Sequence, residues 1–176
     1  KIYNLLLALT YLRKSLGDFL FRFYLLNLVL QKCNKPYINR CASLKKIVER
    51  EKLTTKFIKS LESILETIDL ESIDDILDLR DSDSFSNLWK KAWNQIESEK
   101  INTEKEREKI FNLIYSKTES GDLSAYITED FELIMNFIGL RESNWVTSLC
   151  QSYFTGKIPI GILKNSEKTL IELINE

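Results

Sequence analysis

Apolar residues recur along most of the chain at intervals of three and four residues, which is the spacing of one helix face. Five Gly and two Pro among 176 residues are too few for the frequent turns of an all-β protein. The pattern therefore predicts an all-α protein. The clearest apolar row, which Thr54 or Thr55 would cap, contains Phe57, Ile58, Leu61, Ile64, Leu65 and Ile68.

The first thirty residues are rich in Leu and Phe, but charged residues interrupt them. Arg13, Lys14, Asp18 and Arg22 leave no stretch of apolar residues long enough to span a bilayer. Lys14, Ser15, Asp18 and Arg22 fall on one stripe at helical spacing, so we expect a core helix rather than a membrane span. Its wide apolar surface would include Leu12, Leu16, Phe19, Leu20 and Phe23.

Cap and turn residues divide the rest of the chain into helices. Asn34, followed by Lys35 and Pro36, should end the first helical region, because proline disfavours helix in the residue before it. Further helices are expected to open at Ser43 and at Asp69, the second over about 70–79. Another should follow the polar break at 81–84 and cover 85–96. A helix that opens at Ser143 should close near Gly156.

Thr103 and Glu106 have the spacing of a capping box, which predicts a helix start. Gly121 is expected to cap the end of that helix, and Gly139 the end of a helix over 128–138. A last helix is expected over 166–174. No internal repeat or linker interrupts the series, so residues 1–176 are predicted to form a single-domain irregular bundle of eight or nine helices.

Three cysteines, Cys33, Cys41 and Cys150, form no CxxC pair, and the chain contains no His. Reduced thiols that act as small buried hydrophobes in a cytoplasmic protein are the simpler interpretation, and a Cys33 to Cys41 bridge is the alternative.

The absence of His excludes the common Ser-His-Asp and Cys-His nucleophile systems and the HExxH metal motif. Neither a GxxxxGK[ST] nor a GxGxxG loop is present. A calcium loop starting at Asp81 fails because Ser86 and Ala92 replace the required Gly and Glu. Carboxylates alone could perform acid-base chemistry, but their spacing is not diagnostic. We therefore expect no enzyme, no catalytic residues, no metal site and no cofactor.

Charge is strongly polarised along the chain. Residues 1–60 contain thirteen basic and three acidic residues, whereas residues 62–83 contain nine acidic residues and one basic residue. Within the acidic block, Glu71, Asp74, Asp75 and Asp78 follow helical spacing and should form one stripe. The opposite, packing face would consist of Leu70, Ile73, Ile76, Leu77 and Leu79.

Neighbouring like charges cost about 0.2–0.5 kcal/mol per pair, so the stripe needs an external source of stabilisation. One source is the protein's own basic segment, folded back as an antiparallel neighbour. The other is a basic partner protein, which an acidic surface would attract at long range. The basic residues of the protein's own segment are Lys45, Lys46, Arg50, Lys52, Lys56 and Lys59.

Trp89 and Trp93 lie one helical turn apart and are either interface anchors or core residues. The predicted partner-binding surface combines these aromatic residues with the acidic block: Glu66, Asp69, Glu71, Asp74, Asp75, Asp78, Asp81, Asp83, Trp89 and Trp93.

An all-helical chain without His and with the acids Glu71, Asp74, Asp75 and Asp78 resembles the immunity proteins of bacterial toxin/immunity pairs, including those of contact-dependent growth inhibition systems. The resemblance is one of type and carries no alignable motif. It implies an inhibitor, monomeric or in a heterodimer with its target, that binds a basic nuclease-type toxin domain. The alternative is a helical nucleic-acid-binding or adaptor protein that uses the basic region 32–59.

Overall fold

The computed structural model describes residues 35–96, 101–140 and 142–176, with side chains from residue 44 onward. The chain divides into two compact units, residues 1–47 and 48–176, and the second is described by itself. The expected core helix in the first thirty residues and the side chains of Cys33 and Cys41 lie outside the described residues. One domain over 1–176 therefore stays a prediction.

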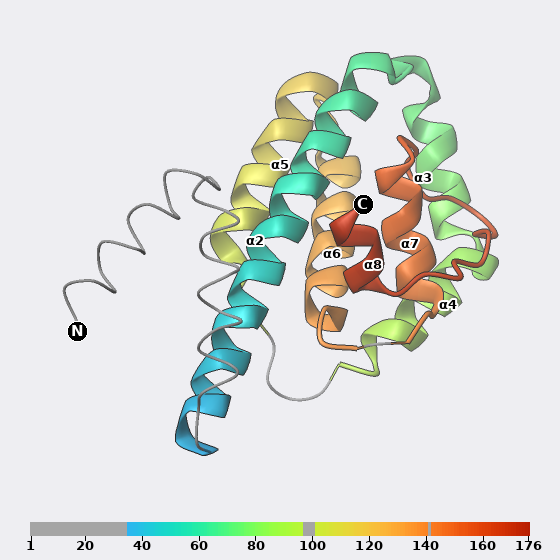
Figure 1. The fold of residues 1–176 in the computed structure, drawn as a ribbon. Helices are drawn as coiled ribbons and strands as arrows, with labels where there is room; N and C mark the ends of the chain where they lie inside the picture. The colour runs from blue at the N-terminus through green and yellow to red at the C-terminus, as the bar shows by residue number, and fades with distance from the viewer. Residues whose placement is uncertain (1–34, 97–100, 141) are drawn as a thin grey trace. The chain divides into compact units, whose positions relative to one another are not determined.

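The described residues form seven α-helices and one short 3-10 helix, η1, and contain no strand (Figure 1). The all-α prediction is confirmed. The elements are α2 (Lys35–Thr67), η1 (Leu70–Ser72), α3 (Ile73–Asp81), α4 (Asp83–Trp93), α5 (Glu104–Thr118), α6 (Gly121–Phe137), α7 (Trp145–Phe154) and α8 (Leu170–Asn175).

The described ranges contain seven α-helices, whereas eight or nine were predicted for the whole chain. One reason is that the two helices expected to start at Ser43 and at Thr54 form a single helix. Helix α2 continues through both Ser43 and Thr54, the positions where helix starts were predicted. The Thr55 hydroxyl donates to the Glu51 carbonyl one turn back, at 2.8 Å. A threonine inside a helix can satisfy its own hydroxyl in this way, so its presence does not require a break.

Some predicted caps are confirmed. The Asp69 carboxylate accepts from the Glu71 amide at 3.1 Å and opens η1, which α3 continues. Gly156 follows α7 with a φ of +79°, a left-handed conformation that glycine adopts without strain. Helix α7 does close there, although Asn144 rather than Ser143 caps its start.

Other predicted caps differ from the structure. The helix start predicted at Thr103 is confirmed, because Thr103 is the N-cap residue of α5, but its buried side chain makes no capping bond. The Asn102 side chain accepts from the Glu104 amide at 3.0 Å. Gly121 begins α6 rather than ending α5, because Glu119 already supplies the left-handed residue at φ +53°. Ser120 caps α6, which therefore starts seven residues before the predicted helix.

Helix α6 provides much of the core of unit 48–176. Its Phe131 ring lies 5.2 Å from Phe57 of α2, and Phe57 lies 4.7 Å from Tyr153 of α7. All three rings are buried. Helix α5 runs alongside α6 (Figure 1), and α8 contacts α7. These contacts give α3 and α4 a fixed base on which to pack.

Helices α3 and α4 form a corner that contacts α6 and α7 respectively. Phe85 of α4 is buried and meets Trp145 of α7 edge-on, with ring centroids 5.3 Å apart. The corner carries much of the acidic block. No helix within the described ranges combines the length and apolarity needed to cross a membrane.

Cys150 is a free, buried thiol in α7, in agreement with the predicted role of cysteine as a small hydrophobe. Burial raises its pKa far above the usual value, and nearby Lys56 offsets this only in part. Because the thiolate is the reactive form, we expect Cys150 to resist iodoacetamide in native protein and to react once urea unfolds it. Peptide mapping by mass spectrometry measures this. Equal labelling rates in the two states would contradict the buried placement.

Candidate acidic docking surface

The acidic stripe, Glu71, Asp74, Asp75 and Asp78, is exposed on η1 and α3. Ile73 lies on the opposite side and is buried, with Ile76 and Leu77 partly buried against the core. The predicted packing face was too wide, however. Leu70, in the 3-10 turn, and Leu79, near the end of α3, are 54% and 46% exposed.

No acid of the stripe takes part in an ion pair within the described ranges; the pairs there include Arg80 with Asp130, Arg107 with Glu132 and Lys168 with Glu176. Two basic residues of α2 bond elsewhere. Lys52 donates to the Asn175 side chain at 2.8 Å, and Lys56 donates to the Leu173 carbonyl. Both contacts are to α8. The described structure therefore gives no support to neutralisation of the stripe by its own upstream lysines.

The other predicted acids are also exposed and lie on successive elements, at the end of α2, the cap of η1 and the α3–α4 corner. Asp69 serves as a cap, and Asp81 accepts from the Tyr126 hydroxyl at 2.6 Å. Glu66 and Asp83 complete the series.

Trp89 and Trp93 are half-buried and stacked, with centroids 5.1 Å apart and planes 11° from parallel. The Trp89 indole N–H donates inward to Asp130 at 2.9 Å, so its polar edge is occupied within the protein. Both rings pack against the core. That either one contacts a partner stays a prediction.

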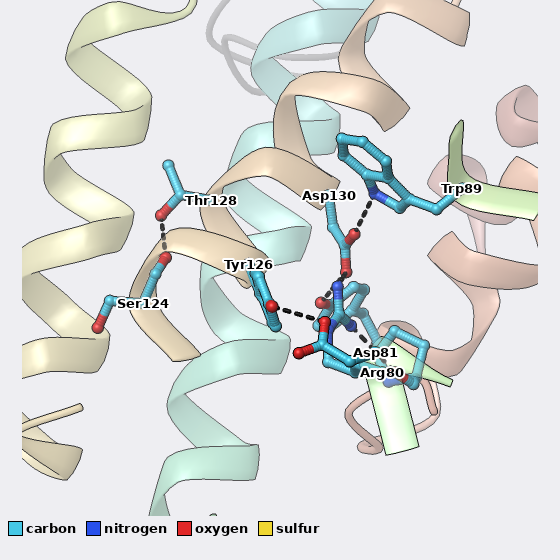
Figure 2. Close-up of polar contacts among 9 residues, drawn as sticks. Arg80, Asp81, Trp89, Ser124, Tyr126, Thr128 and Asp130 are labelled. Carbon is cyan, nitrogen blue, oxygen red and sulfur yellow. Dashed lines mark hydrogen bonds and ion pairs between the residues drawn. The ribbon is translucent and has the colours of Figure 1, made fainter. Parts of the chain in front are cut away.

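A buried polar cluster behind the corner was not predicted from the sequence. Asp130 of α6, fully buried, accepts from three side chains: Arg80 at 2.8 Å, Trp89 at 2.9 Å and Tyr153 at 2.6 Å. Figure 2 shows the Trp89 indole N–H and the Arg80 guanidinium converging on this carboxylate. We call Arg80, Trp89, Asp130 and Tyr153 the Asp130 centre.

The Asp130 centre ties α3 and α4 to α6 and α7. Arg80 also donates to the Pro159 carbonyl at 3.0 Å, which adds the segment after α7. Burial alone would lower the pKa of Arg80, but the adjacent Asp130 carboxylate outweighs it and the pKa lies above its usual value. Burial, followed by Asp130, raises the pKa of Tyr153 well above its usual value. Arg80 is therefore held charged and Tyr153 neutral, as hydrogen-bond donors to Asp130.

One sequence signal could have revealed this centre. Asp130 falls on the apolar row of α6 that contains Ile127, Phe131 and Ile134, and a carboxylate on a packing face needs a buried partner. Arg80 falls likewise on the packing side of α3. The sequence does not say which cation meets which anion.

No three His, Cys, Asp or Glu side chains gather as a metal site within the described ranges. Comparisons with curated proteins and with solved structures gave no match. The family model Immunity protein PIM1 matches residues 45–160, which include the acidic stripe and the whole Asp130 centre. An immunity family indicates an inhibitor rather than an enzyme. Since the match covers most of the chain, this protein belongs to the Immunity protein PIM1 family and is the immunity member of a toxin/immunity pair.

Proposed function

We propose that this protein neutralises a cognate, basic, nuclease-type toxin domain by binding it through the acidic surface of η1, α3 and the α3–α4 corner. The observation that carries the proposal is the exposed stripe Glu71, Asp74, Asp75 and Asp78, which has no ion pair within the described structure. Like charges held together without counter-ions gain stabilisation when a cationic surface covers them.

A nuclease is the toxin class that this surface fits best. Nucleic acid binds to proteins largely through Lys and Arg contacts to phosphate, so a nuclease presents a basic substrate groove. An acidic helix that occupies such a groove competes directly with the phosphate backbone. The same attraction raises the rate of encounter, which matters because a toxin must be captured before it reaches its substrate.

Apolar side chains beside the acids supply contacts that charge alone does not. Leu70, Leu79 and Leu88 are 54%, 46% and 39% exposed. Protein interfaces typically combine an apolar centre with a polar rim, and this surface offers both. The Asp130 centre fixes the backbone beneath it, so little ordering is required when the partner binds.

Co-expression with a basic toxin domain from a neighbouring gene tests the function. We expect restored growth and a one-to-one complex by size-exclusion chromatography, as a cytoplasmic inhibitor requires. A non-cognate nuclease toxin is the control and should kill with or without this protein. Unchanged killing by the cognate domain, at confirmed expression of both chains, would overturn the proposed function.

A further inference from the structure

A pocket of about 290 Å³ opens where the α3–α4 corner meets α6. Three aromatic side chains and two carboxylates contribute to its walls, together with Arg80, Ser86 and Lys90. The aromatic residues are Phe85, Trp89 and Tyr126, and the carboxylates are Asp81 and Glu129.

Internal contacts hold most of these walls in place. The Tyr126 hydroxyl donates to Asp81 at 2.6 Å (Figure 2), and this bond is the main reason that the pKa of Tyr126 is raised to about 12. Trp89 is fixed by its bond to Asp130. The Arg80 guanidinium lies 4.7 Å from the Phe85 ring centroid, so these walls already accommodate one guanidinium against an aromatic face.

Glu129 lines the pocket without a direct polar partner in the part of the chain that the structure describes. It is half-buried, and within the described structure it makes no hydrogen bond and no ion pair. Burial, and then the neighbouring Asp130 carboxylate, raise its pKa. Arg107 and Arg80 offset this rise only in part, and neither forms an ion pair with the ionised Glu129 carboxylate.

The charges that line the pocket favour a cationic ligand. Asp130 neutralises Arg80 from behind, which leaves the carboxylates of Asp81 and Glu129 against the single ammonium of Lys90. Lys90 is exposed at the rim. Carboxylates combined with aromatic faces match a guanidinium better than an ammonium, because the guanidinium is planar and stacks on aromatic rings.

We propose that this pocket receives one arginine side chain of the partner toxin, with Glu129 and Asp81 pairing with its guanidinium and the aromatic walls contacting its stem. The pocket thereby supplies a central anchor for the interface. Buried arginines are common among the residues that dominate binding energy at interfaces. This inference rests on the proposed function for the identity of the guest, but the pocket can be tested without the toxin.

The test without toxin uses 1-butylguanidinium as the probe and NMR of the indole N–H of Trp89. We expect a saturable shift in the wild-type protein, an affinity at least about fivefold lower for Glu129→Gln, and wild-type behaviour for Glu108→Gln, which removes an exposed charge on α5. 1-Butanol should produce no comparable shift. Absence of a saturable shift, or equal binding by Glu129→Gln and the wild type, would overturn the inference.

The test in the complex measures the affinity of the cognate toxin domain for the same two variants. Glu129→Gln should bind about tenfold more weakly, and Glu108→Gln like the wild type. The melting temperature of free Glu129→Gln should not fall, because the replaced carboxylate lacks an internal partner. If the toxin binds Glu129→Gln normally, the arginine pocket is wrong while the proposed function stands. If the toxin does not bind at all, the proposed function fails and the butylguanidinium result alone decides whether the pocket takes a guanidinium.

Discussion

Asp130→Ala should be the most destabilising single substitution in the corner that carries the acidic surface. It leaves the Arg80 guanidinium, only 4% exposed, without its counter-ion, and it removes the acceptor of Trp89 and Tyr153. Breaking a buried ion pair by deleting one partner costs about 3–5 kcal/mol. Typical domains are stable by about 5–15 kcal/mol, so much of the total would be lost. Urea unfolding followed by circular dichroism measures the change.

Two milder variants separate charge from hydrogen bonding in the Asp130 centre. Asp130→Asn keeps an acceptor and the side-chain volume but removes the charge, so its loss should be smaller than that of Asp130→Ala. Tyr153→Phe removes one bond to the carboxylate at 2.6 Å and should cost about 1.5–3 kcal/mol. A loss below about 1 kcal/mol for Asp130→Ala, with the unfolding slope unchanged, would contradict the role assigned to the centre.

The helical character of this protein could be predicted from apolar spacing, because a row such as Phe57, Leu61, Ile64 and Leu65 has one geometric solution that buries it. Helix boundaries were harder. The Thr55 hydroxyl bonds to a carbonyl inside α2, whereas the Thr103 side chain makes no capping bond and Asn102 accepts from the Glu104 amide. Both outcomes depend on which hydrogen-bond partner lies nearest to a polar group in the folded structure. Local residue preference does not determine that partner.

The candidate docking surface, like the fold, was predictable only in part. Exposure of the acidic stripe follows from periodicity, since Ile73 and Leu77 must face the core. The pocket beside it was not predictable, because Glu129 and Asp81 are 48 positions apart and come together only when α6 packs against α3. The same is true of Arg80 and Asp130. Long-range pairing of charges depends on tertiary packing that no local pattern contains.

Reversal of Asp74, Asp75 and Asp78 to Lys should leave the protein folded and slow its association with a basic toxin domain. All three are exposed and have no ion pair within the described ranges. Glu71 would gain two opposite charges one turn away, while the three reversed positions would still repel one another. The gain at Glu71 offsets the cost of placing Lys near the start of α3, so stability should change by at most about 1 kcal/mol. The association rate should fall by about ten- to a thousandfold at low salt, measured by stopped-flow fluorescence.

A matched variant and a salt series show whether this loss reflects position or only net charge. Reversal of Glu108, Glu142 and Glu167, which are exposed on other segments, changes the net charge equally and should slow association far less. The difference between the two variants should narrow at high salt, because screening shortens the reach of the stripe to roughly 3 Å at 1 M. Unfolding of the stripe variant would instead mean that the acids stabilise the protein internally. Association that is insensitive to both the reversal and salt would place the interface on another face. A cationic partner that docks on the stripe must lose electrostatic attraction when the charges are reversed or screened.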